Sequence, residues 1–137
     1  MPWRLAVRTL DTNVVVRLLI GDDPQQTPIA EKAFLDAIAS GGVYLPDVVL
    51  AEVAWVLRGY DLERTTRYQL LERLVRTRGV VVDHMDAVID ALEQFRLGGD
   101  LADQLILARA ASTGALRVLS FDRRFAASAG VELLGPG

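Results

Sequence analysis

Short apolar runs alternate with longer segments of helical pattern along the whole chain, and this alternation constrains the fold more than any other feature. The runs expected to form strands are residues 5–10, 43–45, 80–82, 117–120 and 131–134. The segments expected to form helices are residues 14–20, 27–40, 47–59, 62–78, 85–97 and 101–112, with a last short helix from residue 121. The pattern predicts an α/β fold: a three-layer α/β/α sandwich around a short, mainly parallel sheet of four or five strands.

The length and composition favour one globular domain. With 137 residues, of which 51% are hydrophobic, the chain can bury a core, and we expect a single domain over residues 1–137 with its core at about 5–134. No apolar run is long enough to span a membrane. Arg8 and Asp11 interrupt the apolar start that a signal peptide would need, so we expect a cytoplasmic protein.

The residue types available restrict the chemistry of any site. The chain has no cysteine, and His84 is its one histidine, which excludes disulfides and argues against a zinc site. We interpret His84 as structural rather than catalytic. The net charge of −3 argues against a passive nucleic-acid binder, which is usually basic, but is compatible with an enzyme whose acidic site binds cations.

Glu52 interrupts an otherwise apolar stretch, because the other nine residues of 48–57 are apolar. At helical spacing its neighbours include Val48 and Trp55, so we expect its carboxylate to be at least half buried. A buried carboxylate requires a distant partner or a metal ion. The alternative is a side chain that reaches the surface.

Three further acids stand where helices begin or strands end. Asp11 follows the first expected strand, Asp122 follows the fourth, and Asp103 lies in the first turn of the helix that Asp100 opens. Each acid taken alone could serve its own helix as a cap or dipole partner. Because sites in parallel α/β sheets form at the carboxyl ends of the strands, the acids together indicate a shared pocket.

A shared pocket of carboxylates would be electrostatically costly. Two carboxylates about 5 Å apart repel by roughly 3 kcal/mol at an effective dielectric of about 20. Such a cluster either raises its own pKa values or recruits a divalent cation. An all-oxygen set of ligands favours Mg²⁺ or Mn²⁺.

The acids and their neighbours resemble a known family. The matching segments are Asp11-Thr12-Asn13, Glu52 after residues 48–51, residues 100–106, and Ser120-Phe121-Asp122. In order and spacing they resemble PIN-domain proteins, above all the VapC-type toxins of type II toxin–antitoxin systems, over residues of about 5 to 134. The resemblance implies a PIN-like fold, a Mg²⁺- or Mn²⁺-dependent endoribonuclease acting on RNA, a homodimer, and inhibition by a cognate VapB-like antitoxin protein.

The resemblance also assigns roles to residues. It implies the catalytic acids Asp11, Glu52, Asp103 and Asp122. Asp11 and Asp103 would be the principal metal ligands, with Glu52, Asp122 and Asp100 as further or water-mediated ligands. Site-orienting polar residues would be Thr12, Asn13 and Ser120.

The implied reaction is attack of a metal-activated water on an RNA phosphodiester. With no lysine near the acids, Glu52 or Asp122 would assist that water as a base. The first candidates for phosphate contacts are Arg123 and Arg124, with Arg17 as a weaker one. We interpret the arginines of residues 62–78 as a solvated helix face rather than an RNA track. An antitoxin could dock on Trp55 or on that helix.

Three alternatives to a nuclease need other residues or fewer acids. A response-regulator receiver needs a lysine near its phosphate, and Lys32, the one lysine, lies in a helix expected at the surface. A haloacid dehalogenase needs a second aspartate where Asn13 stands. A non-catalytic PIN-like interaction module stays open as the alternative, although it has no need of four acids.

Overall fold

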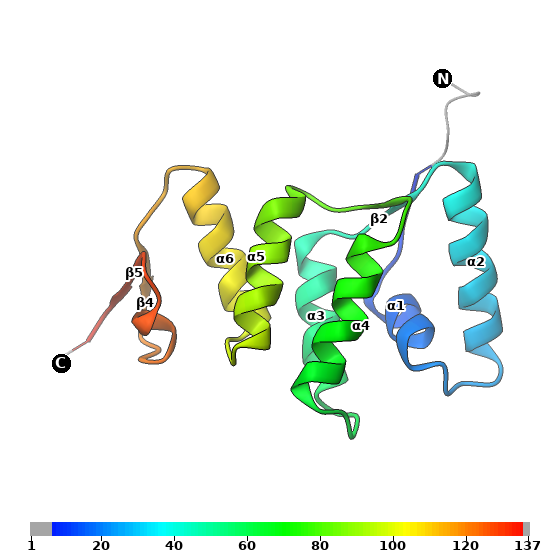
Figure 1. The fold of residues 1–137 in the computed structure, drawn as a ribbon, viewed down its shortest axis with the longest axis horizontal. Helices are drawn as coiled ribbons and strands as arrows, with labels where there is room; N and C mark the ends of the chain where they lie inside the picture. Colours follow the sequence, from blue (N-terminus) through cyan, green and yellow to red (C-terminus); the bar gives the residue numbers. More distant parts are fainter. Residues whose placement is uncertain (1–6, 136–137) are drawn as a thin grey trace.

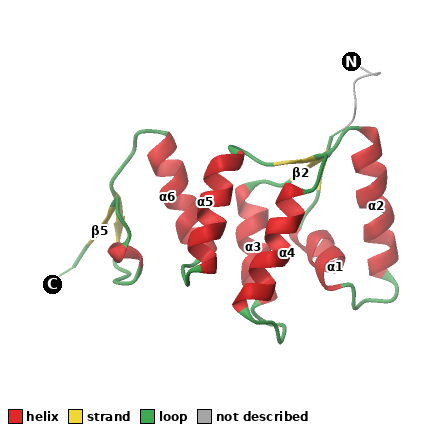
Figure 2. Cartoon of the chain, viewed as in Figure 1, coloured by secondary structure: helices red, strands yellow, loops and turns green. Residues whose placement is uncertain are grey.

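The computed structural model describes residues 7–135, which fold into helices around short parallel strands (Figures 1 and 2). The elements in order are β1 (Arg8–Thr9), α1 (Thr12–Ile20), α2 (Gln26–Ser40), β2 (Val43–Tyr44), α3 (Asp47–Leu57), α4 (Arg64–Arg76), β3 (Val80–Val81), α5 (Met85–Arg96), α6 (Leu101–Ser112), β4 (Val118–Ser120), the 3-10 helix η1 (Phe125–Ala127) and β5 (Val131–Leu133). The predicted α/β class is confirmed. Residues 5 and 6 of the first expected strand lie outside the described range. Within that range no helix has the length and apolar character that a membrane span requires.

Helix α1 forms although its β-branched sequence favours a strand. The Asp11 carboxylate accepts a hydrogen bond from the backbone N–H of Val14 at 3.2 Å and caps the helix. Gly21 ends it with φ of 68°, a left-handed conformation that glycine adopts without steric cost. Val15 and Val16 are buried, so tertiary packing adds to the two caps.

The five strands form two separate parallel sheets. In the first, β2 lies between β1 and β3, and in the second β4 pairs with β5. Figure 1 shows β4, η1 and β5 at one end of the molecule, beyond α6. The strands are parallel as predicted, but β1 pairs only with β2 and β4 only with β5, so the single sheet of four or five strands that we expected is divided.

The core lies between the three-stranded sheet and the helices. Helix α3 contributes most directly, because Leu50, Val53 and Leu57 along one side have no exposed surface. Its opposite side is open to solvent, with Val48 61% and Trp55 65% exposed. This side of α3 therefore carries exposed apolar side chains.

Helix α6 is joined to the rest by an ion pair that reaches across the chain. Arg109 donates to both carboxylate oxygens of Asp47, at 2.6 and 2.7 Å, and to the backbone carbonyl of Asp83 at 2.6 Å. Asp47 and Asp83 are of the residue type that commonly caps helices and stand beside the starts of α3 and α5, but neither caps its helix. Pro46 and His84 occupy those cap positions, since the carboxylate of Asp47 binds Arg109 and that of Asp83 accepts from Tyr44 at 2.6 Å.

Candidate functional site

Asp11 and Glu52 form the first of two acidic groups. Asp11 is exposed at the start of α1. The Thr12 hydroxyl donates a hydrogen bond to Glu52 Oε2 at 3.2 Å, which links α1 to α3. The expected burial of Glu52 is wrong: its side chain is exposed, because it lies on the same open face of α3 as Val48 and Trp55.

The second acidic group joins the start of α6 to the segment after β4. The Asp100 carboxylate caps α6 by accepting from the backbone N–H of Asp103 at 3.0 Å. Burial raises the pKa of the Asp103 carboxyl, and the nearby charges of Asp100 and Asp122 raise it further. These three aspartates therefore lie close enough for their charges to interact.

Asp122 is held in place by its own turn. Its carboxylate accepts from the backbone N–H groups of Arg124 at 2.8 Å and Phe125 at 3.0 Å. The hydroxyl of Ser120 accepts from the backbone N–H of Asp122 at 3.0 Å. Ser120 therefore fixes the backbone that presents Asp122, as a site-orienting residue would.

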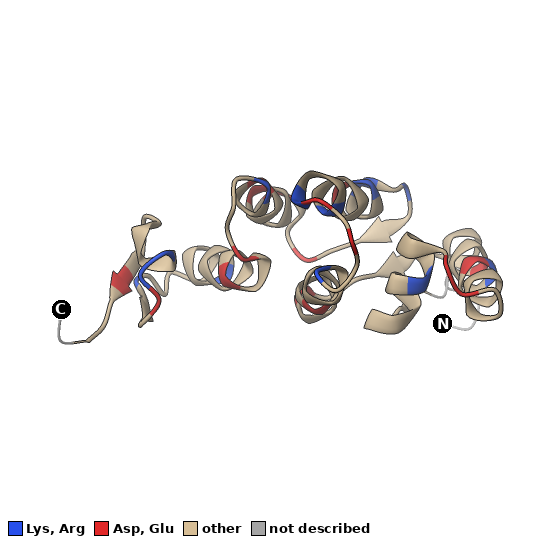
Figure 3. Ribbon diagram, turned by 90° about the horizontal axis from the view of Figure 1, so that it is seen from below, with Lys and Arg blue, Asp and Glu red and all other residues tan. Residues whose placement is uncertain are grey.

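A cavity of about 420 Å³ opens beside the second acidic group. It extends from the end of α3 and the start of α4 to the turn before α6 and the segment after β4. Its charged lining residues are Arg58, Arg64, Arg67, Arg124, Asp100, Asp103 and Asp122. Figure 3, viewed from below, shows basic and acidic segments interspersed across these elements, with several of the basic ones on α4. Asp11 and Glu52 do not line this cavity.

The acids do not form a metal site in this arrangement. Their all-oxygen donors suit Mg²⁺ or Mn²⁺ in kind. Within residues 7–135, however, no three histidine, aspartate or glutamate side chains are grouped so that they could hold a metal ion. The acids predicted to share one pocket stand in two groups, because Asp11 follows a strand of one sheet and Asp122 a strand of the other. Their metal-binding and catalytic roles stay predictions.

The remaining predicted residues are dispersed. Asn13 is exposed beside Asp11. Arg17 donates from Nε to Gln26 at 2.7 Å and lies 3.8 Å from the Asp23 carboxylate, so it is engaged in the turn after α1. Arg123 and Arg124 are exposed after Asp122, and Arg124 lines the cavity.

The sequence did not lead us to predict that arginines would line one side of the cavity. We interpreted Arg64 and Arg67 as part of a solvated face, but both are half-buried, with their guanidinium groups 4.9 and 5.8 Å from the ring centre of Phe95. The helical spacing of the sequence does indicate the position of Arg67. Arg67 precedes the buried Leu71 by four residues and Leu74 by seven, which puts it on the apolar face of α4.

A protein-family model matches most of the chain. Residues 8–131 match the PIN domain. No curated protein and no solved structure shows a significant match to the chain. The matched range includes every acid of both groups and every arginine of the cavity.

Proposed function

The chain belongs to the PIN domain family, whose members are generally nucleases, and from this we propose that it is an endoribonuclease that hydrolyses RNA phosphodiester bonds. One observation carries the proposal beyond the family. Asp11 and Asp122 each lie two residues past the end of a parallel strand, β1 and β4 respectively. This is the position at which α/β proteins hold reactive side chains.

We propose that cleavage requires Mg²⁺ or Mn²⁺. The cation would supply charge to the phosphate and lower the pKa of a bound water. As they stand, the acids of residues 7–135 are not grouped to hold this cation. Glu52, whose carboxylate is exposed and fixed by Thr12, is suited to take a proton from an attacking water.

We propose a homodimer in which β4 of one copy pairs with β1 of the other, in parallel. Among residues 7–135 each of these strands has a free edge, and an isolated two-stranded sheet is marginal in stability. Apolar side chains beside these edges are exposed: Val7 by 50%, Leu119 by 59% and Phe121 by 76%. Because both acids stand at the same offset from their strands, such pairing would place Asp122 beside Asp11.

We further propose that the chain is the toxin of a toxin–antitoxin pair, of the VapC type, and that a VapB-like antitoxin restrains it. The open face of α3 supports a docked partner, since Val48 and Trp55 expose apolar surface on both sides of Glu52. A partner on this face would cover a candidate catalytic carboxylate as well as the apolar surface.

The separation of the acids favours a second candidate, a non-catalytic PIN-like interaction module. The exposed face of α3 would then serve binding alone. The two candidates differ in whether the purified protein cleaves RNA.

The test is cleavage of total cellular RNA by the protein free of its antitoxin, in Mg²⁺, in Mn²⁺ and in EDTA. We expect discrete fragments that require the cation and that Asp11→Asn abolishes. Asparagine caps helices about as well as aspartate, so Asp11→Asn keeps the stability of the wild type. Asp11→Ala removes both the helix cap and the proposed catalytic carboxylate, and it lowers the free energy of unfolding by about 1 kcal/mol.

Urea unfolding of both variants separates catalysis from folding. Cleavage by folded Asp11→Asn at the wild-type rate would remove Asp11 from the site. A folded wild-type dimer that cleaves no RNA in either cation would favour the interaction module.

A further inference from the structure

The basic wall of the cavity is made by three arginines at one junction. Arg58 follows the end of α3, and Arg64 and Arg67 lie in the first turns of α4. The wall formed by these three residues, here called the arginine wall, belongs to the same cavity as Asp100, Asp103 and Asp122.

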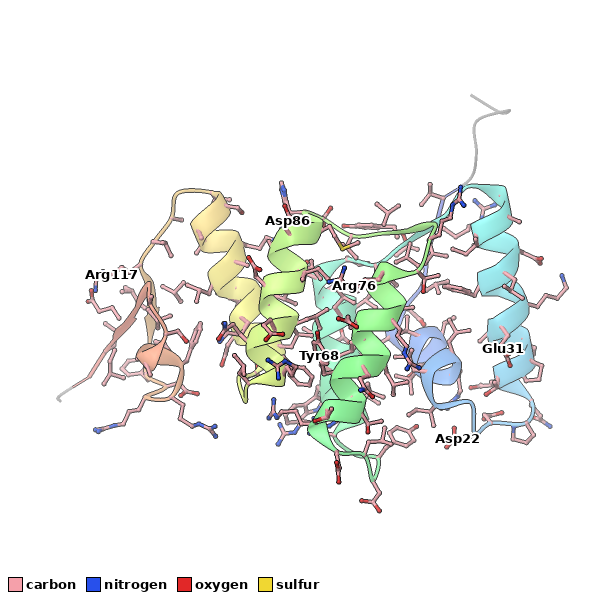
Figure 4. All side chains as sticks on the ribbon, in the orientation of Figure 1. Asp22, Glu31, Tyr68, Arg76, Asp86 and Arg117 are labelled. Atoms are coloured by element: carbon pink, nitrogen blue, oxygen red, sulfur yellow. The ribbon has the colours of Figure 1, made fainter. Side chains whose placement is uncertain are left out.

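In the part of the chain that the structure describes, the arginine wall has no carboxylate partner. None of its three guanidinium groups forms an ion pair within residues 7–135. Arg76, at the other end of α4 (Figure 4), is a contrast, since its Nε lies 3.6 Å from the Glu72 carboxylate. The charges of the wall are therefore uncompensated by acidic side chains in direct contact.

Aromatic rings and backbone carbonyls hold the arginines instead. Arg58 stacks over Trp55, with its guanidinium carbon 4.7 Å from the ring centre. Arg64 donates from Nη1 to the backbone carbonyls of Phe95 and Gly99, both at 2.8 Å. These contacts position the guanidinium groups without neutralising them.

Arg67 is the member of the wall in the least favourable surroundings. Its Nε is buried and has no hydrogen-bond partner. Burial lowers the pKa of the Arg67 guanidinium, and the positive charges of Arg64 and Arg58 lower it further. A buried donor without an acceptor, beside two like charges, is a cost that a bound anion would relieve.

The chemistry of the wall favours RNA as that anion. Guanidinium groups form paired hydrogen bonds with phosphate oxygens. Trp55, 65% exposed at the rim, offers a flat surface on which an unpaired base can stack. We propose that Arg58, Arg64 and Arg67 bind the phosphate backbone of single-stranded RNA beside the acids of the cavity. The proposal deepens the nuclease function, on which it rests for the choice of RNA.

The test measures binding of a short, fluorescently labelled oligouridylate by anisotropy in EDTA, so that cleavage does not contribute. We expect Arg67→Gln to weaken binding about tenfold. The slope of the logarithm of affinity against the logarithm of salt concentration should fall by about 0.7, the value for one lost phosphate contact with a single strand. Arg67→Lys keeps the positive charge but lacks the planar guanidinium group with its paired N–H donors, so it should recover part of the affinity.

Arg73→Gln is the matched control, because Arg73 is an exposed arginine of the same helix outside the cavity. It should bind the oligouridylate as the wild type does. Thermal unfolding tests for a folding defect. Arg67→Gln should unfold no lower than the wild type, since it removes a half-buried cation that Arg64 and Arg58 repel.

Equal affinity of Arg67→Gln and Arg73→Gln would overturn the proposal. So would competition by polyglutamate as strong as that by unlabelled RNA, which would point to an acidic protein segment in the cavity. If Arg67-dependent binding occurs without any cleavage, RNA binding by the arginine wall is supported and the nuclease proposal is refuted. If cleavage occurs and Arg67→Gln leaves binding unchanged, RNA binding by the arginine wall is refuted and the nuclease proposal is supported.

Discussion

Asp103 is a carboxylate whose location in the folded protein makes its charge unfavourable for stability. Its pKa is raised by burial and then by the charges of Asp100 and Asp122, so ionisation costs more in the folded chain than in the unfolded one. Proteins keep such unfavourable groups mainly where function uses them. Asp103 is therefore the member of its group that a stability screen would replace first.

We predict that Asp103→Asn raises the melting temperature at neutral pH by about 1–3 °C while it lowers RNA cleavage. Because the folded pKa is above the unfolded one, the folded wild type binds its proton more tightly. The wild type therefore gains stability relative to the variant as pH falls through the raised pKa, and the difference vanishes below the ordinary range of an aspartate. Melting curves of both proteins across this pH range measure the effect.

Asp86→Asn is the control for this pH dependence. Asp86 is exposed in the first turn of α5, where a negative charge favours the helix, so its removal should lower stability slightly at neutral pH. An Asp103→Asn protein less stable than the wild type at neutral pH would show that the charge of Asp103 is compensated.

Between elements, the ion pair of Arg109 helps to position α6, which carries part of the second acidic group. It binds α6 to Asp47 at the start of α3 and to the backbone after β3. Both side chains are about three-quarters shielded, with 26% and 25% of their surfaces exposed. A shielded, bidentate pair is expected to matter more than one at the surface.

We predict that Arg109→Ala lowers the free energy of unfolding by about 2 kcal/mol, because it leaves the Asp47 carboxylate shielded and unpaired. Arg109→Lys should recover less than half of the lost free energy of unfolding, since lysine lacks the planar group that forms two parallel hydrogen bonds with the carboxylate. Urea unfolding measures this loss in the free energy of unfolding. The slope of that free energy against urea concentration should be the same in the variant and the wild type. If Arg109→Ala in an Asp47→Ala background costs as much as in the wild type, the pair itself contributes nothing.

The elements were predictable where local chemistry determines them. The capping aspartate and closing glycine of α1 predicted a helix against its β-branched sequence, and α6 begins and ends where expected. The exposure of Glu52 and the ion pair of Asp47 were not predictable. Both depend on which side of α3 the distant parts of the chain cover, and the helical spacing around them does not determine that side.

The positions of two candidate acids along the chain were predictable, but the way in which the acids assemble was not. Asp11 and Asp122 stand at strand ends as expected. Their separation depends on strand pairing, and two- or three-residue strands carry little information about their neighbours.

At the scale of the whole molecule, the division into two sheets would allow a dimer to form sites shared between its two chains. If β4 of one copy pairs with β1 of another, each site combines Asp11 of one chain with Asp122 of its partner. Two different inactive variants could then restore each other.

We predict that an equimolar mixture of Asp11→Asn and Asp122→Asn, dissociated and reassociated, regains about a quarter of the wild-type cleavage, because half of the dimers combine both variants and one site of each is intact. Each variant alone should be inactive. Light scattering of the mixture must show dimers. A dimeric mixture as inactive as its components would mean that each chain completes its own site.

Trp55 gives the cavity an optical probe of its own. The chain has two tryptophans, and Trp3 lies outside the described residues, so Trp3→Phe leaves Trp55 as the single emitter. Its indole is open to water on one side and stacked by Arg58 on the other. A nucleobase that displaces this water would quench the emission and shift its maximum, so the occupant of the cavity can be followed by fluorescence without any attached label.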